Sequence, residues 1–317
     1  MSKRARLFSL FAALIIAAIV PTVLAQGIEA KTCNPAHPCP DPSPSTTSTS
    51  DDPVVTAAGD IADAWVPSAD TRATADLVES IDPTVALALG DNQYEGGRIN
   101  QFMLSYDPTW GAFLSRTAPT LGNHEYRSSP TAAGYFEYFG DRAPAPYYSY
   151  DVGAWHLISL DSNCDDIGGC DAGSSEYEWL QADLAAHPST CTLAYWHHPR
   201  WSSGVSHGGT DSVSPFWTLL YDAGADLVLN AHEHNYERFA PQDPSGQLDS
   251  ANGIVEVVAG TGGHELDPIG SPEPNSVARS DTSFGVLELT LHQSSYDFEF
   301  RPVPGDTFTD SGSGTCH

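Results

Sequence analysis

Short apolar runs, each bounded by turn residues, recur along the chain from residue 53 onward. Most are apolar at consecutive positions, a pattern typical of strands that are buried on both faces of a parallel sheet. We therefore predict five buried strands, at residues 54–58, 84–89, 155–160, 192–196 and 225–229.

Segments with the helical spacing of apolar residues separate several of these runs. They predict helices at residues 68–80, 174–187 and 214–222, each opened by a serine that can act as the N-cap. An alternation of strands and helices indicates an α/β fold with a largely parallel sheet.

The last part of the chain has a different pattern. Its apolar runs at residues 254–259, 284–291 and 296–300 follow one another with no helical segment between them. We expect antiparallel strands here, which complete a second sheet.

The first 25 residues have the pattern of a signal peptide. Three basic residues within the first six precede an apolar, uncharged run at residues 7–20, and Ala25 ends a small-residue cleavage site. Because about 20 apolar residues are needed to span a bilayer, we expect cleavage, export to the cell exterior or periplasm, and no membrane association afterwards. A cut after Ala30 and an uncleaved anchor are the alternatives.

Two further segments complete the predicted organisation. Residues 26–52 are rich in Pro, Ser and Thr and cannot bury enough apolar surface to order themselves, so we interpret them as a linker. Residues 53–317 are sufficient for one large domain with a well-buried core, with two small domains as the alternative.

The charge balance is strongly acidic, with 13 basic and 41 acidic residues and a net charge of −28. Removal of residues 1–25 takes away three basic residues and no acid, which gives 10 − 41 = −31. Lys31 is then the one remaining lysine. A field of this sign repels polyanions, so a nucleic-acid partner is not expected.

Six cysteines in an exported chain indicate disulfides, because oxidising compartments preserve them. Six cysteines allow fifteen pairings, so the sequence does not fix the connectivity. The pairing that closes the shortest loops joins Cys33 to Cys39 and Cys164 to Cys170, which leaves Cys191 and Cys316. The absence of a CxxC pattern argues against a thiolate metal site or a cysteine nucleophile.

Side chains that can bind metals follow the predicted strands in five loops. Their carboxylate, amide and phenol oxygens and imidazole nitrogens suit iron, zinc or manganese. One such loop alone is weak support, because Gly-Asp is common in turns and His-x-His can pack on one face of a strand. The combination predicts a metal site, since functional groups of α/β sheets gather in these loops. The loops contain residues 59–60, 90–94, 122–125, 196–199 and 231–234.

This ordered set resembles the calcineurin-like metallophosphoesterases and, more closely, the purple acid phosphatases, whose blocks are GDxG, GDxxY, GNH(D/E), VxxH and GHxH. Residues 90–94 and 122–125 match their blocks in full, and Tyr94 selects the purple acid phosphatases. The resemblance covers about residues 54–300. It implies an α/β fold, a four-layer αββα metallophosphoesterase sandwich in which helices flank two mixed sheets.

Three blocks depart from the family pattern without losing a metal ligand. Ala62 stands at the final glycine of GDxG, Ala194 replaces the valine of VxxH, and Ala231 replaces the first glycine of GHxH.

The resemblance implies two metal ions that share Asp91, about 3.5–4 Å apart. A tyrosinate at Tyr94 implies Fe(III) at its site, with Fe, Zn or Mn as the second metal. One ion would be bound by Asp60, Asp91, Tyr94 and His234, and the other by Asp91, Asn123, His197 and His232.

Two further histidines are candidate catalytic residues beside Asp91. In the family the residue at His124 binds no metal, faces the substrate and assists the leaving group; a histidine that only supports a ligand is the alternative. His207 lies in a Gly/Ser-rich stretch where the family often has a substrate-facing histidine, with an ordinary loop histidine as the alternative. Glu125 is expected to orient His124, and Arg238 to brace the same wall.

The resemblance therefore implies a secreted phosphoric ester hydrolase that cleaves small phosphate monoesters by in-line attack of a hydroxide held between the metals. A phosphodiesterase, for example of cyclic nucleotides, would use the same site, and a non-catalytic metal-binding module would retain the fold alone. The sequence leaves the oligomeric state open.

Overall fold

The computed structural model describes residues 52–317. The predicted signal peptide, the predicted linker, Cys33 and Cys39 lie outside these residues, so the boundaries at residues 25 and 52 stay predictions. Among the described residues, no helix combines the length and the apolar character that crossing a bilayer requires.

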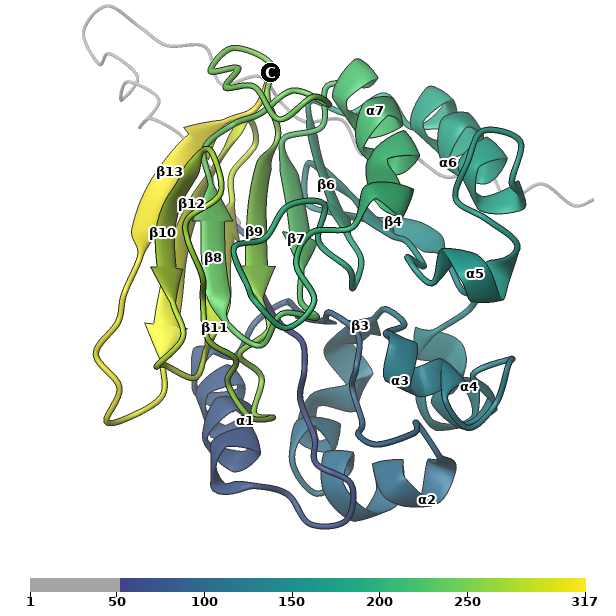
Figure 1. Ribbon diagram of the computed structural model, residues 1–317, viewed down its shortest axis with the longest axis vertical. Coiled ribbons are helices and arrows are strands. Elements are labelled where there is room, and N and C mark those ends of the chain that lie inside the picture. The colour runs from purple at the N-terminus through teal and green to yellow at the C-terminus, as the bar shows by residue number, and fades with distance from the viewer. Residues whose placement is uncertain (1–51) are drawn as a thin grey trace, which may run out of the picture. The chain divides into compact units, whose positions relative to one another are not determined.

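Two mixed sheets form the centre of the described unit (Figure 1). The first has the strand order β13-β12-β11-β1-β2-β3 and the second the order β10-β8-β9-β7-β6-β5-β4. The strands of the first sheet are β1 (Val54–Ala58), β2 (Val85–Ala88), β3 (Thr117–Pro119), β11 (Gly285–Leu291), β12 (Ser295–Pro302) and β13 (Ser311–Thr315). Those of the second are β4 (Tyr148–Val152), β5 (Trp155–Ser159), β6 (Cys191–Tyr195), β7 (Leu227–Asn230), β8 (Tyr236–Phe239), β9 (Val255–Ala259) and β10 (Ser276–Ser280).

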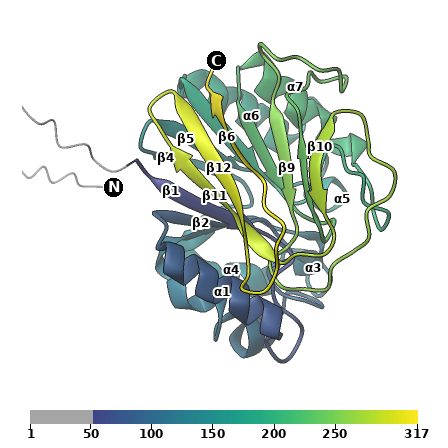
Figure 2. The same cartoon turned by 90° about the vertical axis from the view of Figure 1, so that its left-hand side faces the viewer.

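Helices cover the outer face of each sheet, as Figure 2 shows for α1 and α4 on one side and α6 and α7 on the other. The α-helices are α1 (Ala69–Ile81), α2 (Ile99–Gln101), α3 (Asn123–Tyr126), α4 (Ala133–Phe139), α5 (Cys164–Ile167), α6 (Ser175–Ala186) and α7 (Ser214–Asp222). A π-helical turn at Phe102–Tyr106 and 3₁₀ turns at Trp110–Arg116, Gly140–Arg142 and Asp211–Val213 complete the set.

Alternating side chains divide the core into three apolar layers, because successive residues of a strand point to opposite faces. In β1, Val55 and Ala57 pack between the two sheets, whereas Ala58 packs under the helices of the first sheet. In β6, Leu193 faces the space between the sheets and Ala194 faces α7. The result is the expected four-layer αββα sandwich.

The eight predicted strands are confirmed within one or two residues, but the expectation of one largely parallel sheet is wrong. Strands β1 and β2 belong to one sheet and β5, β6 and β7 to the other, so each sheet has its own parallel centre. The C-terminal strands do not all complete one second sheet as antiparallel strands. Strand β9 pairs parallel to β7, while β11 pairs antiparallel to the free edge of β1.

Two of the three predicted serine caps are confirmed. Ser68 Oγ accepts a hydrogen bond from the Thr71 N–H at 2.9 Å, and Ser174 Oγ accepts one from the Tyr177 N–H at 3.3 Å. Ser214 lies inside its helix instead, because the preceding 3₁₀ turn runs directly into α7 and already gives Ser214 a helical conformation.

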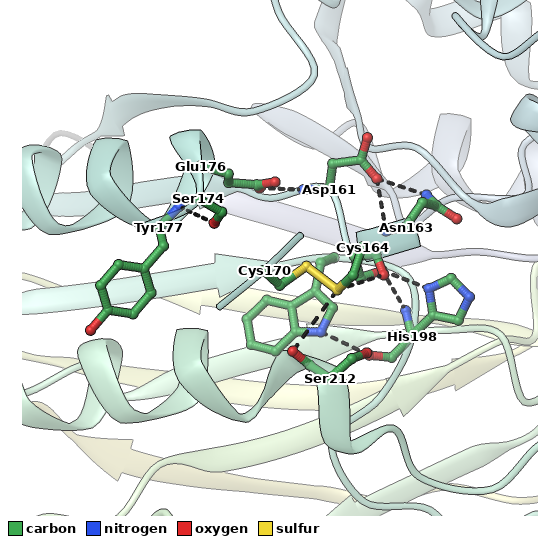
Figure 3. The surroundings of a disulfide bond; sticks show 11 residues. Asp161, Asn163, Cys164, Cys170, Ser174, Glu176, Tyr177, His198 and Ser212 are labelled. Atoms are coloured by element: carbon green, nitrogen blue, oxygen red, sulfur yellow. Dashed lines mark hydrogen bonds between the residues drawn. A yellow bond between two sulfur atoms is a disulfide. The ribbon is translucent and has the colours of Figure 1, made fainter. Parts of the chain in front are cut away.

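Two disulfides are present among the described residues. Cys164 and Cys170 close a short loop around α5, and Cys191 at the start of β6 is joined to Cys316 beyond β13 (Figure 3 shows the first). The second bond therefore ties one sheet to the other across 125 residues of sequence.

Candidate metal and phosphoester site

The five candidate loops meet where the parallel strands of both sheets end. In α/β proteins, the carboxyl ends of the strands place functional side chains together. Contacts between the sheets confirm the meeting point: the Gly59 N–H donates to the Ala259 carbonyl at 2.9 Å, and His197 Nδ1 lies 3.0 Å from the Leu89 carbonyl.

Asp60, Tyr94 and His234 form the first group of potential ligands. Tyr94 Oη donates a hydrogen bond to Asp60 Oδ1 at 2.7 Å and lies 2.9 Å from His234 Nε2. His234 Nε2 is 3.6 Å from Asp60 Oδ1. One atom from each of three separate loops therefore faces a common point.

Asp91, His197 and His232 form the second group. His197 Nε2 lies 3.3 Å from Asp91 Oδ2 and 3.2 Å from His232 Nδ1. Asp91 and His197 are buried. Asn123 Oδ1 is also buried, and it has no hydrogen-bond partner among residues 52–317. Since buried polar atoms are nearly always satisfied, this oxygen fits a site that binds a cation.

Backbone carbonyls fix the orientation of two of these imidazoles. His197 Nδ1 bonds the Leu89 carbonyl, and His234 Nδ1 bonds the Glu265 carbonyl at 2.8 Å. Because a carbonyl can only accept, each Nδ1 carries the hydrogen, and each Nε2 is free to bind a metal.

The backbone is strained at three of the candidate ligands. Asp60, Asp91 and His232 have φ angles of 57°, 46° and 72°, in the left-handed region that non-glycine residues rarely adopt. Strain of this kind clusters at functional sites, where the surrounding structure holds it in place.

Glu125 stabilises the strained Asp91 loop. Its buried carboxylate accepts hydrogen bonds from the backbone N–H groups of Asp91, Asn92 and Gln93 at 3.1, 2.9 and 3.3 Å, and from that of Gly122 at 2.7 Å. The prediction that Glu125 orients His124 is therefore wrong.

The structure accommodates the departures at Ala62 and Ala231. A β-carbon on Gly59 would lie 2.4 Å from the Ala231 methyl, so the absence of a side chain at Gly59 makes room for this alanine. Ala62 is buried and bridges to Gln93 with φ outside the left-handed region, so no glycine is required there.

Burial and charge shift the pKa values within the site. Burial, with Asp60 beside it, raises the pKa of Tyr94 well above its ordinary value. Burial opposes protonation of His197, but the Asp91 carboxylate outweighs it and raises the pKa of His197 to about 9. Burial lowers the pKa of His124. The two buried carboxylates thus give the site a negative potential that a cation would neutralise.

His124 and His207 both line a pocket of about 340 Å³ above these groups. His124 Nε2 is 3.8 Å from Asp91 Oδ2, and its Nδ1 lies 3.0 Å from the Glu95 carbonyl. The half-exposed His207 ring lies 4.2 Å from that of His232. Of the nine predicted site residues, seven line the pocket, and Asp60 and His197 are the two that do not.

Glu233, which sequence reasoning did not single out, holds the His207 loop. Its buried carboxylate accepts hydrogen bonds from the N–H groups of His207, at 2.5 Å, and Gly208. The position of Glu233 between two candidate ligand histidines is the one feature of the sequence that could have indicated a role at the site.

His198 packs behind the candidate ligand His232. Its ring centroid lies 4.3 Å from that of His232, and its Nδ1 lies 2.7 Å from Ser162 Oγ. Ser162 precedes the loop closed by the Cys164–Cys170 disulfide, and Figure 3 shows His198 beside this loop. This contact joins residues remote in sequence, so the sequence alone gave no signal for it.

Two other residues near the predicted loops differ in their relation to the pocket. His264 stacks on Tyr94 with ring centroids 3.8 Å apart, and it lines the pocket. Arg238 does not brace the site. It forms a salt bridge with Asp310 at 2.6 Å, on the strand β8 side of the second sheet.

The sequence model of the calcineurin-like phosphoesterase family matches residues 54–236. The chain belongs to this family. Among curated proteins it is similar to purple acid phosphatase 18 of Arabidopsis thaliana, with 29% identity over 71% of this chain and 55% of the relative. Purple acid phosphatase 21 of the same plant is 31% identical over 56% of this chain and 45% of the relative. The chain thus spans about half the length of these relatives.

Solved structures show the same fold. A purple acid phosphatase from yellow lupin (Lupinus luteus) seeds matches with a TM-score of 0.65 and 20% identity, over 83% of this chain and 53% of that one. GAP50, the anchor in the inner membrane complex of Plasmodium, also matches with a TM-score of 0.65, at 14% identity, over 84% and 90% of the two chains. A fold shared by a phosphatase and an anchor does not define activity, which depends on the site.

Proposed function

We propose that this protein is a metal-dependent phosphoric ester hydrolase that acts on small phosphate monoesters. The observation that carries the proposal is that two groups of ligand atoms, one around Tyr94 and one around Asp91, reach the same pocket as His124. Membership of the calcineurin-like phosphoesterase family supports the same reaction class.

Two metal ions fit the side chains of the site. Asp60, Tyr94 and His234 would bind one, and Asn123, His197 and His232 the other, with Asp91 between them. When bound, such a pair polarises phosphoryl oxygens and makes water acidic enough to act as a nucleophile. The ligand types suit Fe(III) beside Tyr94 and Fe, Zn or Mn at the second position.

His124 is positioned to assist the leaving group. Its Nδ1 donates to the Glu95 carbonyl, so its Nε2 faces the pocket. Its backbone N–H donates to Asp91 Oδ1 at 2.8 Å, which fixes its place relative to the proposed bridging carboxylate. In the imidazolium form, in which Nε2 also carries a hydrogen, this nitrogen would deliver a proton that stabilises the departing alkoxide.

The pocket suits a small ester. Its volume of about 340 Å³ lies near the lower end of small-molecule sites, about 300–1,000 Å³. Its lining residues include Arg127 and the half-exposed His207, which can contact phosphate oxygens. The Arg127 guanidinium also lies 3.2 Å from the Glu95 carboxylate. We further propose export, outside the cell or to the periplasm, on the basis of the N-terminal sequence pattern.

Hydrolysis of p-nitrophenyl phosphate tests this function. The purified protein should release phosphate, and chelation should abolish the release until metal is restored. Preference for bis-p-nitrophenyl phosphate would show a phosphodiesterase on the same site. Bound metal without turnover of either ester would show a non-catalytic module.

A further inference from the structure

A second group of side chains that can bind a metal lies in the second sheet, at the end of the strands away from the candidate site. Strand β5 runs from Trp155 toward the candidate site, and His156 stands near its start. Strand β6 is parallel to β5, so helix α6 returns the chain to the end of the sheet where β5 begins. Asp183 and His187, at the C-terminal end of α6, therefore lie beside His156. The group is therefore remote from the pocket.

Ligand atoms of the three side chains lie close together. His156 Nε2 is 3.0 Å from Asp183 Oδ2, and His187 Nδ1 is 3.1 Å from Asp183 Oδ1. His187 Nδ1 also lies 3.0 Å from the Asp183 carbonyl, so this nitrogen carries a hydrogen that would move to Nε2 when zinc binds Nδ1. All three residues offer an atom within 4.8 Å of the others. Around a tetrahedral zinc ion with bonds of 2.0–2.2 Å, neighbouring ligand atoms are about 3.3 Å apart, close to these spacings.

Outer partners already orient the group as they do in zinc sites. His156 Nδ1 lies 2.8 Å from Asp151 Oδ1, the arrangement in which a carboxylate fixes the tautomer and leaves Nε2 for a metal. Ser149 Oγ donates to Asp183 Oδ1 at 2.7 Å. His156 and Asp183 are buried, whereas His187 is half exposed and leaves an approach from solvent.

Charge favours a divalent cation at this position. The Asp183 carboxylate is buried, and burial of an uncompensated charge is unfavourable, whereas the Asp151 carboxylate is exposed. A divalent ion would neutralise Asp183, and its binding releases the protons that the ligand atoms carry.

We propose that His156, Asp183 and His187 bind a zinc ion, with water as the fourth ligand. This ion is separate from the metals of the proposed active site, and it joins the end of α6 to β5. Its role is structural, because no pocket residue of the candidate site contacts it.

Zinc content of His187→Ala tests the proposal. Apo-protein of the full chain is dialysed to equilibrium against micromolar zinc, and bound zinc is measured by mass spectrometry. The unmodified protein should bind one zinc more per chain than His187→Ala. Added zinc should also raise the Tm of the unmodified protein more than that of His187→Ala.

His292→Ala is the matched control. His292 is also partly exposed and lies between two carboxylates, Asp52 at 2.6 Å and Asp297 at 3.1 Å, but no second imidazole of residues 52–317 joins it in a ligand group. The control should retain the full zinc content. Asp151→Asn, at an exposed position, should weaken the site by about 10–100-fold.

Equal zinc content in the unmodified protein and His187→Ala would overturn the proposal and leave the group as an ion-pair network. The experiment compares the zinc content of two folded proteins, so its result does not depend on whether the pocket hydrolyses esters.

Discussion

Tyr94 donates a hydrogen bond of 2.7 Å to Asp60, across two loops that follow neighbouring parallel strands. The pair is buried, and the acceptor has a strained backbone. A phenol and a carboxylate placed together in this way can both bind a trivalent cation as anions, because the cation lowers the pKa that burial raises. The identity of the metal is therefore tied to this tyrosine.

Replacement of Tyr94 by phenylalanine should remove any visible absorption of the iron-loaded protein. Tyrosinate bound to Fe(III) gives a charge-transfer band, which phenylalanine cannot give. Metal affinity at this position should fall at least about tenfold, since even an outer partner contributes 10–100-fold. Absorption spectra and metal content measure both effects. A colourless, fully active unmodified protein containing only zinc or manganese would remove the iron assignment and leave the hydrolase assignment intact.

His124→Asn should lower kcat most for esters with poor leaving groups. A positioned general acid contributes about 10²–10⁴-fold. An alkyl phosphate should therefore lose about 100-fold or more, whereas p-nitrophenyl phosphate should lose much less because nitrophenolate departs without a proton. Steady-state kinetics on both esters gives the comparison, with His292→Asn as a remote control. An equal loss on both esters would show that His124 does not protonate the leaving group.

Glu125→Gln should destabilise the fold and lower activity together. The substitution leaves one oxygen where two accept four backbone hydrogen bonds, and an unsatisfied buried donor costs about 1–3 kcal/mol. Urea unfolding measures the change. Glu137→Gln on the exposed side of α4 is the control and should change stability by less than about 0.5 kcal/mol. Unchanged stability of Glu125→Gln would contradict the proposed support of the Asp91 loop.

Stability should fall as pH rises from about 4.5 to 8. Burial raises the pKa of Glu256 from 4.5 to about 8. Between these values the unfolded chain has lost the proton that the folded protein keeps, so the free energy of unfolding decreases with pH, by about 3–5 kcal/mol in total from this group. Denaturant unfolding across this range measures the slope.

Glu256→Gln should reduce that slope, because an amide does not titrate over this range. Its amide oxygen can still accept a hydrogen bond from the Arg200 N–H, which lies 2.7 Å from Glu256 Oε1. An identical slope in the variant would exclude Glu256 as the cause.

The sequence identified the site more completely than the fold. Residue types alone placed Asp60, Tyr94 and His234 in loops after strands, and the structure brings them together. The two mixed sheets were expected, but the assignment of strands to them was not, because an apolar run shows that a strand is buried but not which strand it pairs with. Strand β9, predicted as antiparallel, pairs parallel to β7 through such a non-local contact.

The supporting residues were predicted least well. Glu125 was expected to orient His124, yet its carboxylate accepts hydrogen bonds from the Asp91 loop. His156 lies inside the predicted strand at residues 155–160, and its partner Asp183 lies 27 residues away. Such contacts depend on tertiary packing, which local sequence patterns do not encode.

Anomalous diffraction from crystals of the metal-loaded protein tests the central claim most directly. The account predicts two metal peaks on either side of the Asp91 carboxylate, about 3.5–4 Å apart, with Tyr94 bound to one and Asn123 to the other. A single peak at this position, or two peaks that Asp91 does not join, would contradict it.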